Sequence, residues 1–229
     1  MRLLAIDSST DWLSVAAGDA HAQALFEEPA SNAHSERVMP LVRQALAAAG
    51  WHLRDLNAIA FGAGPGAFTG VRIACAVAQG LALGTGIPLL PVGTLEAMAE
   101  EARRRHGESR VLAALDARMQ EVYFAAYAFE RDGWQAVTAP DVGRPDGVAM
   151  PRGDWAAAGD GFVRYPALAA RLGIARVHGD VRPSARAILT LAVARVAAGE
   201  AVAAHDALPV YVRHRVALTL AERDAGVRL

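Results

Sequence analysis

The chain has 229 residues, a length that allows one large domain or two small ones. Hydrophobic residues make up 53% of it, which is enough for a packed core and argues against a disordered chain. The net charge of −1 excludes a chain that is basic throughout, as nucleic-acid-binding proteins usually are. All 23 basic residues are arginine, which excludes a phosphate-binding, Schiff-base or general-base lysine.

The first third of the chain predicts strands followed by alternating helices and strands. A turn formed by Asp7, Ser8, Ser9 and Thr10 joins the first two strands, and Gly18 and Asp19 lead into the third. The predicted strands are 3–6, 12–17, 22–26, 58–61 and 88–92, and the predicted helices are 35–49, which ends at Gly50, and 94–105, which Thr94 caps. This order indicates an α/β layer built on a mixed sheet.

The segment 62–84 is the most informative part of the sequence. A loop containing Gly62, Gly64 and Gly66 leads into a helix that we expect to begin near Thr69 or Gly70. Within 70–84 only Arg72 and Gln79 are strongly polar, whereas an ordinary surface helix keeps one polar face. We therefore expect this helix to be covered by its own domain on one side and by another subunit on the other.

Small residues lie in two rows along this helix. They recur every four residues, a spacing that places them on one helix face, where a second helix could approach closely. The rows are Gly66, Gly70, Ala74 and Ala78, and Ala76, Gly80 and Gly84.

Two other interpretations of this segment remain open. A membrane-spanning helix is one, although Arg72, Gln79 and the glycines interrupt the apolar run, and no second apolar span exists. The other is an anion site, because the start of a helix presents free N–H groups. The loop has neither common phosphate-binding glycine pattern, so tight packing of loop against helix is the preferred interpretation.

The second part of the chain begins near residue 110 and contains a weak internal repeat. When Asp7 is aligned with Asp116, strand 3–6 falls on 112–115, and Leu13 falls on Val122. The repeat predicts two related lobes, each aiming a carboxylate at a common cleft. Beyond it we expect long loops at 130–180, a helix over 184–199, a strand over 208–212 and a terminal tail.

Few residues stand out as candidates for chemistry. The seven histidines include no pair three or four residues apart, which argues against a metal site on one helix. Cys75 lies inside the apolar helix, where an inert buried thiol is expected. The N-terminal apolar run is too short for a signal peptide, so a cytoplasmic protein is expected.

Nucleotide binding is the strongest chemical candidate from the residues alone. Actin, heat-shock ATPases and sugar kinases hold ATP phosphates and magnesium at a strand-Asp-turn-strand hairpin in each of two lobes. Here the turns lack the usual glycine, so we interpret the hairpin residues as relics of such a site. The relic residues are Asp7, Ser8, Ser9, Thr10 and Asp116.

Several motifs together resemble the TsaD/glycoprotease-like family, in its branch of non-catalytic partner subunits that serve tRNA threonylcarbamoyladenosine synthesis. The matching stretches are LLAIDSST, HSERVMPLV, GPGAFTGVRIACAVAQGLALG, PVGTLEAMA, VLAALDARMQEVYFA and PVYVR. The resemblance implies an actin-like fold with an N-terminal lobe at 1–108 and a smaller, reduced C-terminal lobe at 109–229. The catalytic subunit's HxxxH metal ligands fall here on Thr94 and Met98, so no metal and no catalytic residues are expected.

The resemblance also implies partners. These are a TsaD-type catalytic paralogue, a TsaE-type ATPase and a second copy of the chain. The chain is expected to contact tRNA only through the complex and not to bind a membrane. Any ATP or ADP is expected at the interface of the complex. The expected partner interface consists of His34, Arg37, Val38, Leu41, Gly66, Phe68, Thr69, Gly70, Arg72, Ile73, Ala74 and Val77. An ATP-hydrolysing actin-like protein and, less favoured, a metallopeptidase remain as alternatives.

Overall fold

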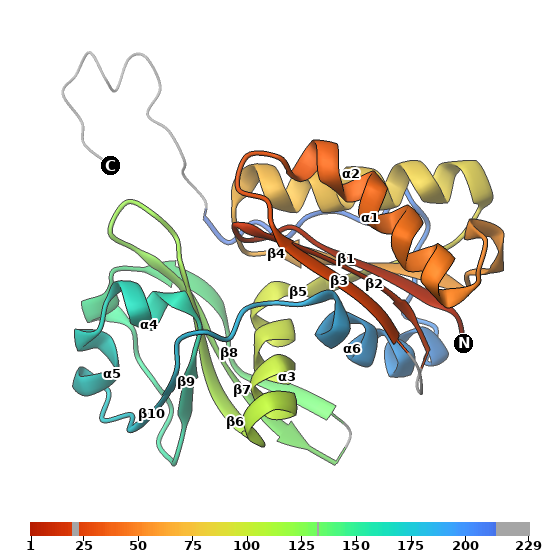
Figure 1. Ribbon diagram of the computed structural model, residues 1–229. Coiled ribbons are helices and arrows are strands. Elements are labelled where there is room, and N and C mark those ends of the chain that lie inside the picture. Colours follow the sequence, from red (N-terminus) through yellow and green to blue (C-terminus); the bar gives the residue numbers. More distant parts are fainter. Residues whose placement is uncertain (20–22, 132, 214–229) are drawn as a thin grey trace.

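The computed structural model describes residues 1–19, 23–131 and 133–213, which form two lobes, each built on one five-stranded sheet (Figure 1). The N-terminal lobe has the strand order β3-β2-β1-β4-β5. Its strands are β1 (Leu3–Asp7), β2 (Trp12–Gly18), β3 (Gln23–Pro29), β4 (Ala58–Gly64) and β5 (Leu89–Gly93). β1 to β3 pair antiparallel, and β4 and β5 are parallel to β1. The predicted mixed sheet is confirmed.

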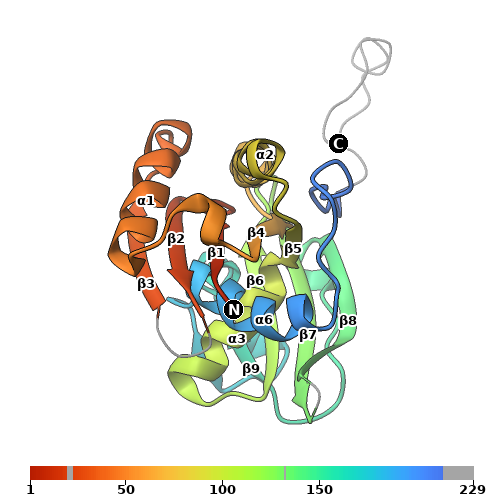
Figure 2. The same ribbon diagram turned by 90° about the vertical axis from the view of Figure 1, so that its right-hand side faces the viewer.

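Helices cover both faces of this sheet (Figure 2). The alternation of side chains along the strands divides the core between them. One face packs against α1 (His34–Ala49) and α2 (Phe68–Thr85), through Leu4, Ile6 and neighbouring side chains. The other face, which includes Leu3 and Ala5, packs against α6 (Ala185–Ala197). A short 3-10 turn, η1 (Leu53–Asp55), precedes β4.

The C-terminal lobe repeats this sheet with much smaller helices. Read from β8, its strand order is β8-β7-β6-β9-β10. Both sheets therefore contain their strands in the same spatial order, which is third, second, first, fourth and fifth along the chain of each lobe. The strands are β6 (Arg110–Asp116), β7 (Val122–Glu130), β8 (Gly133–Gly143), β9 (Ala156–Ala158) and β10 (Arg176–His178). The short helices are η2 (Pro145–Gly147), α4 (Asp160–Arg164) and α5 (Ala167–Arg171). The fold class predicted from the sequence, α/β with two related lobes, is confirmed.

The internal repeat holds for the first strand of each hairpin but slips by one residue in the second. Asp7 pairs with Ser14, whereas Asp116 pairs with Val122, so the second turn is one residue shorter. Val122 is therefore the counterpart of Ser14 and not of Leu13. Compared with the alignment without gaps, this slip places every side chain of the second strand on the opposite face of the sheet.

The two lobes exchange helices. α3 (Thr94–His106) follows the last strand of the first sheet but packs on the second sheet, through Leu95, Met98 and Ala102. α6 follows the second sheet and returns to the first. A division of the chain at 108/109 therefore separates the two sheets, but it does not separate the helices that cover them.

Two local predictions near the helices are wrong. Thr94 is the first residue of α3 and not its cap, because Gly93 occupies that position, and the Thr94 hydroxyl instead accepts a hydrogen bond from the Gly64 N–H (3.1 Å). The segment 208–212 forms no strand, and its backbone makes a single hydrogen bond to β4, from the Val210 N–H to the Ala63 carbonyl (2.7 Å). The predicted tail lies outside the described residues.

The glycines at the start of α2 are required by close packing within the chain. A Cβ at Gly70 would lie 1.8 Å from the carbonyl oxygen of Ser8, and one at Gly66 would lie 2.5 Å from that of Ser9. Ala74 and Ala78 continue this row and are fully buried. The first row of small residues therefore packs against the chain's own sheet and turn, and not against a second subunit.

α2 is the single helix among the described residues that is long and apolar enough to span a membrane, by length and composition only. One such helix is weak support for a membrane span. In this structure α2 packs beside α1 against the first sheet, and its inner side contributes to the core of the N-terminal lobe.

Substituting Gly70 with alanine should destabilise the fold. The added Cβ would overlap the Ser8 carbonyl oxygen, so we expect the free energy of unfolding to fall by about 1–3 kcal/mol, the usual range for overpacking. Gly80→Ala in the same helix is the matched control, because nothing lies within 4 Å of a Cβ there. That change should stabilise the chain by about 0.5–1 kcal/mol. Urea unfolding of both variants measures the difference, and equal effects would contradict this role of Gly70.

Candidate functional site: the interlobe cleft and the outer face of α2

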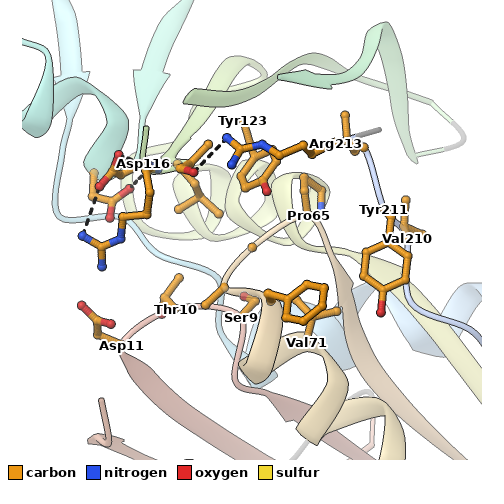
Figure 3. Close-up of a pocket in the computed structure, with 18 of the residues that line it drawn as sticks. Ser9, Thr10, Asp11, Pro65, Val71, Asp116, Tyr123, Val210, Tyr211 and Arg213 are labelled. Carbon is orange, nitrogen blue, oxygen red and sulfur yellow. Dashed lines mark hydrogen bonds and ion pairs between the residues drawn. The ribbon is translucent and has the colours of Figure 1, made fainter. Parts of the chain in front are cut away.

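A cleft of about 600 Å³ lies between the two lobes (Figure 3). The β1–β2 turn and the start of α2 form one wall, and the β6–β7 turn forms the opposite wall. Its polar part includes Ser9, Thr10, Asp11, Asp116 and Asp160. Its apolar part includes Phe68, Val71, Met119, Tyr123 and Tyr211. The chain therefore retains a ligand-sized space where the repeat predicts one.

Asp7, the first relic residue, does not reach this cleft. Its side chain is fully buried, and its carboxylate accepts hydrogen bonds from the Ser9 backbone N–H (3.2 Å) and hydroxyl (2.9 Å). The other carboxylate oxygen lies so close to Gly62 that a Cβ there would be 2.0 Å from it. Burial raises the pKa of Asp7 to about 6, although the bonds from Ser9 favour the charged form. The sequence-based expectation that Asp7 faces the cleft is wrong.

The turn after Asp7 is closed from the other side by α2. The Ser8 hydroxyl donates to the carbonyl of Gly70 (2.7 Å), and the Ser9 carbonyl accepts from the Ala67 N–H (2.7 Å). Ser8 and Ser9 are both buried, and of the first-lobe relic residues only Ser9 and Thr10 line the cleft. The turn therefore lacks the glycine that permits close approach to the backbone in nucleotide-binding hairpins, and α2 packs against it.

Asp116, the relic residue of the second lobe, does line the cleft. Its carboxylate accepts from the Arg118 N–H (3.1 Å) and lies 3.4 Å from the Arg118 guanidinium. Its own N–H donates to Asp160 (3.0 Å), and burial raises the pKa of Asp160. Asp116 is thus held by neighbours of its own lobe, and the two repeat aspartates do not face one another.

The outer face of α2 carries exposed small and apolar residues and one charge. Leu83 is 78% exposed, and Arg72 is the single charged residue of this face. We define the outer face as Thr69, Arg72, Ala76, Gly80, Leu83 and Gly84, all of which are exposed. The second row of small residues, Ala76, Gly80 and Gly84, therefore lies on the surface, where a partner could approach closely.

The expected interface residues divide into exposed and buried sets. Those exposed or half-buried are Arg37, Gly66, Phe68, Thr69, Arg72, Ile73 and Val77. Those buried within the chain itself are His34, Val38, Leu41, Gly70 and Ala74. The buried five form part of the chain's own packing, so they do not provide the surface that we expected of them. Helical spacing alone could not distinguish the inward row from the outward one.

The two positions aligned with the catalytic subunit's metal ligands serve in packing here. The Thr94 hydroxyl is bonded to the Gly64 N–H, and Met98 is fully buried between α3 and the second sheet. A Cβ at Gly159 would lie 2.2 Å from the Met98 methyl group, which shows how tightly that side chain is enclosed. Within the part of the chain that the structure describes, no three His, Cys, Asp or Glu side chains cluster as metal ligands would.

Sequence reasoning missed the part that the chain's last described residues play in the site. Val210, Tyr211, Val212 and Arg213 form one side of the cleft. The available signal is the motif PVYVR at 209–213, which predicts a strand. Its alternating apolar residues resemble a strand, whereas its actual contacts are made mainly by side chains.

Comparison with known proteins identifies relatives along nearly the whole chain. The model of the family TsaD, tRNA N6-adenosine threonylcarbamoyltransferase, matches residues 26–208. The chain is 42% identical to the Escherichia coli tRNA threonylcarbamoyladenosine biosynthesis protein TsaB, over 95% of this chain and 96% of that protein. It is 43% identical to the Haemophilus influenzae protein of the same name, over 57% of this chain and 56% of that protein.

Solved structures agree with this relationship. The structure titled YeaZ from Pseudomonas aeruginosa has a TM-score of 0.84 and 40% identity, covering 92% of this chain and 99% of that one. A second Pseudomonas aeruginosa structure, titled as similar to peptidase YEAZ, has a TM-score of 0.87 and 40% identity, with coverages of 93% and 99%. The chain therefore belongs to the TsaD family and, within it, to the TsaB proteins, also called YeaZ.

Proposed function

We propose that the chain is the non-catalytic partner subunit of a tRNA threonylcarbamoyltransferase. In this proposal a TsaD-type paralogue transfers the threonylcarbamoyl group to N6 of the adenosine adjacent to the tRNA anticodon. The chain supports that reaction by docking on the paralogue. The names of its relatives place them in threonylcarbamoyladenosine synthesis, which favours this pathway over the other candidates.

The uncovered outer face of α2 is the observation that carries the proposal. Its residues leave apolar surface in water, which a monomeric soluble protein seldom does over a whole helix face. Docking would remove this surface from water, and each Å² of apolar area buried contributes about 25 cal/mol. Ala76, Gly80 and Gly84 leave room for a second helix to approach closely, and Arg72 supplies one charged contact at the edge.

The adjacent helix α1 widens the proposed docking surface. α1 and α2 lie side by side on the same face of the first sheet (Figures 1 and 2). Ile73 and Val77 are half-buried, and both pack on the cluster that α1 and α2 share. The docking surface that we propose therefore consists of the outer face of α2 and the neighbouring surface of α1. Arg37, one of the expected interface residues, lies apart from it, because its guanidinium pairs with Glu28 of the edge strand β3 (2.6 Å).

The positions where catalytic or nucleotide-binding residues would be expected serve in packing, which agrees with a supporting role and not a catalytic one. Thr94 and Met98 are committed to packing, and the turn after Asp7 is closed by α2. Each of these positions serves the stability of the fold. The chemistry would then belong to the paralogue, whose own residues bind the metal and the nucleic acid.

The remaining partners follow from the same proposal. A TsaE-type ATPase joins the pair, tRNA is reached through the complex, and any ATP or ADP binds at an interface between subunits. In the absence of the paralogue, the outer face of α2 would pair two copies of the chain. We place this assembly in the cytoplasm, where tRNA is modified.

Charged substitutions on the outer face of α2 should weaken docking. Ala76→Glu and Leu83→Glu each place a carboxylate where apolar surface would be buried, so we expect the dissociation constant for the TsaD-type protein of the same organism to rise about tenfold or more. Isothermal titration calorimetry measures this affinity for the full chain.

Val163→Glu is the matched control for these two variants. Val163 is 66% exposed, compared with 78% for Leu83, but it lies on α4 of the other lobe. It should leave the affinity unchanged. Wild-type affinity in both Ala76→Glu and Leu83→Glu would show that the partner docks elsewhere.

Replacing Asp7 with asparagine should change how stability depends on pH. Because burial raises the pKa of Asp7 from 3.8 to about 6, its contribution to stability is fully present below pH 3.8 and is lost as the pH rises through 6. Asparagine can still accept the bonds from Ser9 but cannot ionise. We therefore expect Asp7→Asn to gain about 2–3 kcal/mol in free energy of unfolding, relative to wild type, between pH 4 and pH 7.5.

Urea unfolding at several pH values measures this difference. Asp11→Asn, which removes an exposed carboxylate from the same turn, controls for the loss of one negative charge. A constant difference between Asp7→Asn and wild type across the pH range would contradict a buried, structural Asp7.

A further inference from the structure

The chain after α6 crosses to the other face of the first sheet and lies along one side of α2. We define residues 204–213 as the C-terminal strap. The Gln79 side-chain amide donates to the carbonyls of Ala204 (3.1 Å) and Ala207 (3.0 Å). The Cys75 thiol donates to the same Ala207 carbonyl (3.4 Å), and Ala207 is fully buried. The middle of the strap is therefore fixed to α2.

The next residues of the strap are fixed to the same lobe. The N–H of Val210 donates to the carbonyl of Ala63 in β4 (2.7 Å). The Arg72 Nε donates to the Tyr211 hydroxyl (2.8 Å), and the Arg72 guanidinium lies over the Phe68 ring (3.5 Å from its centroid). Arg72, Cys75 and Gln79 are spaced by three and four residues, so they form one stripe of α2. This stripe of polar groups in an apolar helix contacts the strap.

The last described residue of the strap crosses to the other lobe. Arg213 donates to the Glu121 carboxylate (2.6 Å), to the Ala117 carbonyl (3.0 Å) and to the Met119 sulfur (3.2 Å). Its side chain is only 13% exposed, and its guanidinium lies 5.8 Å from the centre of the Tyr123 ring (Figure 3). The partly buried ion pair is less screened by solvent than an exposed one.

The turn that Arg213 holds has an unfavourable backbone conformation. Arg118, Met119 and Gln120 all have positive φ angles, between 52° and 61°. Non-glycine residues adopt this region at a cost, and such a turn persists only when surrounding contacts determine it. The contacts of Arg213 on both sides of these residues provide that support.

We propose that the C-terminal strap is a latch that joins the two lobes across the mouth of the cleft. One end is fixed to α2 and β4, and Arg213 holds the β6–β7 turn of the opposite lobe. The latch fixes the opening of the cleft without any ligand between the lobes. The strap is also a wall of the cleft, so releasing it would widen the cleft and expose Tyr123 and Val71. This proposal does not depend on how the chain docks on a partner.

A substitution in one lobe should therefore loosen a hydrogen bond in the other. Glu121→Gln removes the charge that Arg213 pairs with in the C-terminal lobe. The Val210 N–H is bonded to the N-terminal lobe, and we expect its hydrogen exchange to accelerate about tenfold in this variant. Cys75, the single cysteine of the chain, reports the same event through its rate of labelling by a thiol reagent. Arg213→Ala should accelerate both reactions by a similar factor.

Glu130→Gln is the matched control, since Glu130 is an exposed carboxylate at the far end of β7, the strand that Glu121 immediately precedes. The double variant Glu121→Gln, Arg213→Ala should be no faster than Arg213→Ala alone, because both changes break one contact. Urea midpoints of all variants separate local release from global unfolding. If Glu121→Gln leaves Val210 exchange and Cys75 labelling as slow as Glu130→Gln does, the strap does not latch the lobes and the proposal is wrong.

Discussion

The close approach of α2 to the β1–β2 turn is the contact on which the site depends. The carbonyl of Ser8 lies where a Cβ of Gly70 would be, and the Ser8 hydroxyl is bonded to the Gly70 carbonyl. Only glycine permits this distance. The contact closes the turn that a phosphate would need, and it also fixes which side of α2 faces inward. The arrangement of the turn and the orientation of α2 thus depend on the same contact.

Each side of α2 then has a separate use. The row of Gly70, Ala74 and Ala78 packs inward against the first sheet and its turn. The stripe of Arg72, Cys75 and Gln79 contacts the strap that crosses to the second lobe. The outer face is exposed, and it is the face that we propose binds a partner. Arg72 belongs to both the stripe and the outer face, so the proposed docking surface and the cleft meet at this residue.

The sequence predicts the elements of the first lobe better than their contacts. The long loops expected at 130–180 are wrong, because this segment contains β8, β9, β10, α4 and α5. Hydrophobic periodicity located the strands of the first lobe and the helices 34–49 and 185–197 to within a few residues, because these depend on local alternation of polar and apolar side chains. The exchange of α3 and α6 between the sheets has no local signal, since each helix has an apolar side that could pack on either sheet. The register slip at Val122 arises from a turn that is one residue shorter, which an alignment without gaps cannot detect.

The candidate site was predictable only in part. The apolar character of α2 correctly indicated a helix with an unusual surface, but Val38, Leu41 and Ala74 were assigned to that surface although they are buried. Helical spacing predicts which residues share one face of a helix, but not whether that face points into the lobe or toward solvent. Asp7 was assigned to the cleft by analogy with Asp116, and its burial beside Gly62 depends on a neighbouring strand that the repeat does not describe.

We propose that the outer face of α2 pairs this chain with a catalytic subunit. Light scattering after gel filtration measures the mass of the full chain alone and after mixing with the TsaD-type protein of the same organism. We predict a homodimer alone that converts on mixing to a complex with one copy of each chain. A monomer whose mass does not change on mixing would contradict the claim, because the apolar face would then remain uncovered in the presence of its proposed partner.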